Sequence, residues 1–141
     1  MRKLIFLTLI SLFAILSTAS DSQAQSVEEL ESTGLQHYKK AYFKAIPQKN
    51  RAMADEEFAM AEKAFRKAIK KNPQRVKAYL HLGLTYSAQK KYAAAAATYR
   101  SALAIAPQHK RIYLRLASAL EKNGDYRGHG NIPGQYTVDF Q

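Results

Sequence analysis

The chain has 141 residues, of which 47% are apolar, so one small globular domain is the expected organisation. It contains no cysteine, which excludes disulfide bonds, thiol catalysis, cysteine-based zinc sites and a lipid-modified cysteine. The formal net charge of +11 favours acidic proteins, anionic lipid surfaces or anionic polymers as partners, although a basic surface can also be a generic solvated face.

The first 24 residues have the layout of a secretory signal peptide. A positive head at 1–3 precedes an apolar run at 4–16, which is short beside the roughly 20 residues of a membrane span. Small and polar residues then predict cleavage after Ala24, with a second possible cut after Ala19. We therefore expect an exported protein, periplasmic or secreted, that rarely meets nucleic acid. An uncleaved N-terminal anchor is the alternative interpretation.

A helix is predicted over residues 27–46. Leu30, Gly34 and Tyr38 recur at helical spacing and share one face, and residues 42–43, Tyr-Phe, continue this apolar stripe. A loop around residues 47–50 is expected to follow it.

The rest of the chain repeats itself with a period of 34 residues. Ala61, Phe65, Ala68 and Pro73 become Ala95, Tyr99, Ala102 and Pro107, and Tyr79, Leu80, Leu82 and Tyr92 become Tyr113, Leu114, Leu116 and Tyr126. Each block predicts two helices joined by a polar turn, and the proline ends the second helix because it has no amide hydrogen to donate. The helices are expected at about 53–71, 75–89, 92–105 and 110–122.

The run of five alanines at 93–97 belongs to one of these helices. Ala95 lies opposite Gly83 in the expected pair, and two small residues let the helix axes approach closely. The flanking alanines add helix propensity. The run is therefore interpreted as a helix with a narrow packing face, against the alternative of low-complexity disorder.

This pattern resembles the tetratricopeptide repeat family. The residues that carry the resemblance, and that we expect to pack the repeat, are Tyr79, Leu82, Gly83, Tyr86, Ala95, Tyr99, Ala102 and Pro107. The resemblance covers about residues 26–126 and implies an all-α fold, a short right-handed solenoid of antiparallel helix pairs with a concave groove. It also implies that the protein holds protein partners and does not act as an enzyme.

Both ends of the repeat array depart from the pattern. The first repeat contains about 15 extra residues, and the last has one good helix followed by residues 127–141, which are rich in glycine. We favour a flexible tail there, with a short extended segment or a truncated gene product as alternatives. Two and a half repeats would leave the stripe of Ile112, Leu116 and Leu120 partly uncovered, so the tail, a second copy or a partner is expected to cover it.

We find no pattern for catalysis, a metal or a cofactor. The four histidines, His37, His81, His109 and His129, include no pair four residues apart on one helix, and no carboxylate cluster joins them. No nucleophile turn and no phosphate-binding glycine loop is present. The protein is therefore predicted to be neither an enzyme nor a metal or cofactor carrier.

The concave groove is the candidate site for a partner. In the resembled family the first helix of each repeat lines this groove, and here those helices carry Lys77, His81, Arg111 and Arg115. The spacing is four within each pair and 34 between pairs, which suits an acidic peptide or a terminal carboxylate. The alternatives are a solvated basic face, a binder of anionic lipid or polymer with peripheral membrane contact, or a fragment of a larger repeat array.

Overall fold

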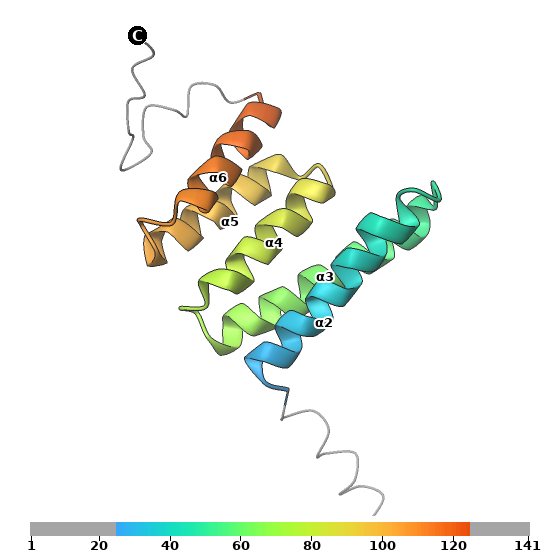
Figure 1. The fold of residues 1–141 in the computed structure, drawn as a ribbon, viewed down its shortest axis with the longest axis horizontal. Helices are drawn as coiled ribbons and strands as arrows, with labels where there is room; N and C mark the ends of the chain where they lie inside the picture. The colour runs from blue at the N-terminus through green and yellow to red at the C-terminus, as the bar shows by residue number, and fades with distance from the viewer. Residues whose placement is uncertain (1–24, 125–141) are drawn as a thin grey trace, which may run out of the picture.

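The computed structural model of the chain describes residues 25–124, and all its regular elements are helices (Figure 1). They are α2 (Val27–Lys40), a π-helical turn η1 (Ala41–Ala45), α3 (Arg51–Lys71), α4 (Val76–Ala88), α5 (Tyr92–Ile105) and α6 (Lys110–Lys122). The predicted all-α fold class is confirmed. The proposed signal peptide at 1–24 and tail at 127–141 lie outside the described residues.

The helices follow one another across the molecule in chain order, and each packs mainly against the next (Figure 1). Helix α2 with η1 pairs with α3, α4 pairs with α5, and α6 closes the row against α5. Within residues 25–124, no helix is both long enough and apolar enough to cross a membrane.

Local sequence signals define where the first helices begin. Ser26 forms a capping box with Glu29: its hydroxyl accepts the Glu29 backbone N–H at 3.1 Å, and its own N–H donates to the Glu29 carboxylate at 2.8 Å. The Asn50 side chain accepts the Met53 N–H in the same way at the start of α3. These bonds satisfy backbone donors that a helix leaves unpaired in its first turn.

The helices of each pair approach closely where a glycine faces an aromatic ring. A Cβ atom added to Gly34 would lie 2.7 Å from the ring of Phe65, and one added to Gly83 would lie 2.7 Å from Cζ of Tyr99. Both distances are well inside van der Waals contact, so the absence of a side chain sets the spacing of each pair. The same contact is made twice, although the two repeats differ in length.

The alanine run packs on one side only. Ala95 and Ala96 are buried in the core, whereas Ala93 and Ala97 are exposed. Small side chains are thus required at Ala95 and Ala96, whereas the exposed Ala93 and Ala97 are free to vary in size.

The extra residues of the first repeat lengthen its helical hairpin. Gly34 and Phe65 are 15 residues further apart in sequence than Gly83 and Tyr99, and most of this excess is helical, in η1 and the first turns of α3. Because Ala41 and Ala45 already fill the side that faces α3, the neighbouring residues 42–43 turn towards solvent. The expectation that residues 42–43 continue the apolar stripe is wrong for this reason.

The apolar stripe of α6 is better covered than the sequence suggested. Ile112, Leu116 and Leu120 are almost completely buried against the core that α5 contributes to. Leu114 remains 72% exposed. The stripe itself therefore needs no second copy or partner to remove it from water.

A pair of substitutions in the alanine run tests how closely α4 and α5 pack. Ala95→Leu adds three heavy atoms at a site without solvent access, and overpacking of this kind costs about 1–3 kcal/mol. Ala97→Leu adds the same atoms on the exposed side and should change stability by less than about 0.5 kcal/mol. Chemical denaturation of both variants measures the difference, and equal stability would contradict the close packing of this pair.

Candidate functional site

The predicted partner-binding residues lie on α4 and α6, the first helices of the second and third repeats. Lys77, Arg111 and Arg115 are exposed, and none of them makes an ion pair within 4.0 Å among residues 25–124. Three cations are therefore available on α4 and α6. We call Lys77, Arg111 and Arg115 the cationic face.

On α2, the position equivalent to Lys77 carries the opposite charge. When Gly34 is aligned with Gly83, Glu28 falls at the position of Lys77, and Lys77 in turn corresponds to Arg111 through the repeat of 34. Glu28 lies 3.3 Å from Arg75. The charge along the first helices thus changes from acidic on α2 to basic on α4 and α6.

His81 differs from the other three residues because it is partly buried. Its ring packs 5.4 Å from that of Phe65, and its Nδ1 atom is shielded from solvent without a hydrogen-bond partner. Burial, reinforced by the charge of Lys77, lowers the pKa of His81 below its usual range. The imidazole is therefore neutral at neutral pH and adds no charge to the cationic face.

Arg115 connects the cationic face to two tyrosines. Burial raises the pKa of both Tyr38 and Tyr99, and the charge of Arg115 opposes this shift at each hydroxyl. Tyr99 has no solvent exposure, so of the two rings only that of Tyr38 reaches the surface.

An ion pair that the sequence analysis missed joins the first two repeats. Arg75 donates two hydrogen bonds to the carboxylate of Glu31, at 3.1 and 2.9 Å, and Glu31 is buried. A bidentate pair of this kind fixes orientation as well as charge. The partners are 44 residues apart, so the only sequence signal was an acid at a buried position of α2.

A second buried acid occupies the extended part of the hairpin. Glu57 of α3 accepts a hydrogen bond from His37 at 2.6 Å and pairs with Lys40. These bonds, the one from Lys40 first, hold the pKa of Glu57 below its usual range. Both buried acids are thus paired with a basic side chain from outside their own helix, Glu31 with Arg75 and Glu57 with Lys40. Residues 25–124 contain no group of three or more side chains able to hold a metal ion.

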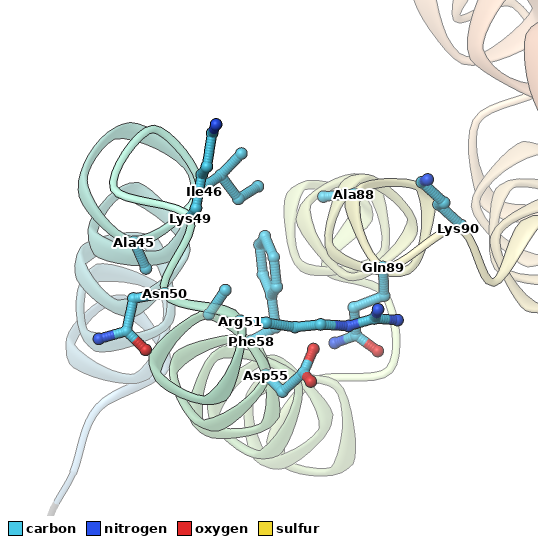
Figure 2. Close-up of a pocket in the computed structure, with 11 residues that line it drawn as sticks. Ala45, Ile46, Lys49, Asn50, Arg51, Asp55, Phe58, Ala88, Gln89 and Lys90 are labelled. Carbon is cyan, nitrogen blue, oxygen red and sulfur yellow. The ribbon is translucent and has the colours of Figure 1, made fainter.

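A notch of about 300 Å³ lies where α4 ends and the longer hairpin continues (Figure 2). The ring of Phe58 stands between the two helix ends, with Ala54 and Ala88 among its apolar neighbours. Lys49 and Arg51 lie at its edge. No residue of this notch was predicted to form a site, because it exists only through the unequal lengths of neighbouring hairpins.

Comparison with known proteins supports the repeat. A tetratricopeptide repeat family model matches residues 50–110, which include α3, α4 and α5. No curated protein matches the chain. The packing and this match together describe a short tetratricopeptide-like helical repeat, a class that generally mediates protein–protein interaction and is generally non-catalytic.

The lowered pKa of His81 predicts a loss of stability in mild acid. The unfolded chain takes up a proton near the ordinary histidine pKa of about 6.5, whereas the folded protein resists protonation at this site. Stability is therefore lost progressively as the pH falls below about 6.5. His81→Gln should lose less Tm than the wild type between pH 7.5 and 5.5, and parallel Tm profiles would contradict this assignment.

Proposed function

We propose that this protein is a non-enzymatic scaffold that holds an acidic segment of a partner protein against its cationic face. The observation that supports this most directly is that Lys77, Arg111 and Arg115 are exposed and make no ion pair within 4.0 Å among the described residues. Lys77 and Arg111 share one repeated position and Arg115 lies one turn beyond Arg111, so exposed cations recur along the chain and can bind successive carboxylates.

The change in charge from α2 to α4 and α6, the first helices of the three repeats, also defines the direction in which the partner segment binds. Its acidic residues bind at α4 and α6, while the end that reaches α2 meets Glu28 and is neutral or basic. Arg75 does not contribute, because its guanidinium is held by Glu31. The proposed ligand is thus an extended peptide with its acidic residues at one end.

Matched charge reversals test the cationic face. Lys77→Glu, Arg111→Glu and Arg115→Glu together should abolish binding of a short fluorescein-labelled peptide rich in glutamate with a free terminal carboxylate. Each lost charged contact costs about 1.5–3 kcal/mol, which is roughly tenfold or more in affinity. Fluorescence anisotropy of chain 25–141 measures the dissociation constant.

The control triple Lys63→Glu, Lys67→Glu and Lys70→Glu makes the same change in net charge on the exposed side of α3. It should retain most of the binding, and a glutamine-rich peptide of equal length should bind neither protein. Equal losses in the two triples would show that only net charge matters, and would overturn the proposal.

Three alternative functions are distinguished by measurements on the same protein. Binding of anionic polymers and acidic peptides alike, with steep loss in salt, indicates a basic envelope-surface binder. Dimers that disappear on Leu114→Ser indicate self-association through α6, since Leu114 is its exposed large apolar residue. A folded chain without any ligand is the result expected of a fragment of a larger array.

Export is part of the same proposal. It is supported by the apolar run at 4–16 and by the capping box, which begins α2 only two residues after the proposed cut at Ala24. When the full chain is produced in a bacterium, the periplasmic fraction should contain a protein whose N-terminal residue is Gln25, as read by intact mass. An uncleaved chain in the membrane fraction would instead identify residues 1–24 as an anchor.

A further inference from the structure

We propose that the extended end of the first helical hairpin is a binding surface for anionic lipid membranes. We define this end, the hairpin tip, by three apolar residues, Tyr42, Phe43 and Ile46, and three cations, Lys39, Lys44 and Lys49. The inference goes beyond the proposed groove function, because the tip contains none of the residues of the cationic face.

The hairpin tip gathers most of the large apolar surface that the fold leaves in water. Of the five large hydrophobic side chains exposed among the described residues, three are Tyr42, Phe43 and Ile46, with exposed fractions of 45%, 69% and 44%. Tyr42 and Phe43 pack edge to face at 5.2 Å between ring centroids, and Tyr38 stacks on Tyr42 at 5.8 Å. The rings are therefore held together as one projecting apolar surface.

The fold does not require these side chains for its own core. Ala41 and Ala45 have no solvent exposure and close the hairpin against Ala54 and Phe58. The whole segment is an insertion beyond the contact of Gly34 with Phe65, which already holds the pair together. Exposed aromatic residues in an insertion lower solubility, and an exposed apolar cluster rimmed by polar residues commonly marks an interaction site.

The charge around these rings indicates an anionic surface as the occupant. Five cations and no acid lie between residues 39 and 51 of the sequence. Lys40 is paired with Glu57, but Lys39, Lys44, Lys49 and Arg51 make no ion pair within 4.0 Å with any described residue. The nearest acids, Asp55 and Glu56, begin one turn further along α3. Aromatic and aliphatic side chains beside lysines are the combination that binds anionic headgroups at a bilayer interface.

The shape of the tip favours a membrane over a second copy of the chain. Figure 1 shows the hairpin of α2 and α3 projecting past the end of α4, so that a broad, nearly flat surface can reach it. Ile46 and Lys49 project together from the same helix end, away from α3 (Figure 2). Two tips placed against each other would bring their unpaired lysines together, and like charges would oppose that contact.

The tip lies at the far end of α2 from residue 27, where the chain enters the fold (Figure 1). Binding through the tip is separable from peptide binding, because the reversal of Lys77, Arg111 and Arg115 leaves the tip unaltered.

Vesicle co-sedimentation of chain 25–141 tests the proposal with two matched double variants. The probe is large vesicles of phosphatidylglycerol and phosphatidylcholine, with pure phosphatidylcholine for comparison. Phe43→Ser with Ile46→Ser should weaken binding to the anionic vesicles by about tenfold or more. Met60→Ser with Leu114→Ser removes the other two exposed large apolar residues. This control should bind the anionic vesicles within about twofold of the wild type. Tyr42 is kept in both double variants because it stacks on Tyr38.

A tryptophan probe reports the contact directly, because the chain has no tryptophan of its own. The emission of Phe43→Trp should shift to shorter wavelength on adding anionic vesicles and should be quenched by brominated lipid. Leu114→Trp, in an otherwise identical chain, should show neither change. Circular dichroism of each variant confirms that the helices are intact.

Absence of wild-type binding to anionic vesicles would overturn the proposal. So would equal losses in the two double variants, or equal shifts for the two tryptophans. Peptide binding retained by the Phe43→Ser and Ile46→Ser protein would separate failure at the tip from failure at the groove.

Discussion

The close approach of each helix pair, glycine against aromatic ring, is the constraint on which the rest of the structure depends. Gly34 leaves room for Phe65, and Gly83 leaves room for Tyr99, so both pairs make the same kind of close contact. The rings then form the shared core together with Ile112 and neighbouring buried residues. Because the contact needs only one glycine and one ring, the chain on either side can lengthen without disturbing it. The longer first hairpin is possible for that reason.

Two buried acids, Glu31 and Glu57, bind some of the basic side chains and leave others free of ion pairs. Glu31 is paired with Arg75 across two repeats, and Glu57 is paired with Lys40 and hydrogen-bonded to His37 within the first. Buried charges are tolerated only when they are paired and hydrogen-bonded. These pairs use basic groups near α2 and α3, and the cations of α4 and α6 remain available to other molecules. The proposed partner segment is acidic because Lys77, Arg111 and Arg115 are among the exposed cations left unpaired.

The insertion adds a second surface of a different kind. Helix α4 ends where the hairpin of α2 and α3 continues, which creates both the notch at Phe58 and the hairpin tip. Small alanines seal the inside of the extension, so its large apolar side chains face water. A scaffold that holds a peptide on its first helices and lies against a membrane through its tip would bring a partner to the membrane surface. The two contacts are made by different residues.

The sequence by itself determined the helices, their order and their packing register, because these depend on residues close together in the chain. The helical spacing of Leu82, Gly83 and Tyr86 and the stop at Pro107 act within single helices, and the period of 34 repeats this pattern in the next pair. The sequence placed Ala95 opposite Gly83, whereas in the structure the ring of Tyr99 makes the close contact with this glycine. Tertiary structure decided what these local signals leave open. The pairing of Arg75 with Glu31, the burial of His81 and the covering of Leu116 depend on which helix lies beside which. Helical periodicity also predicted an inward stripe through residues 42–43, but beyond the end of α4 Ala41 and Ala45 alone fill the inner face and the rings turn outward.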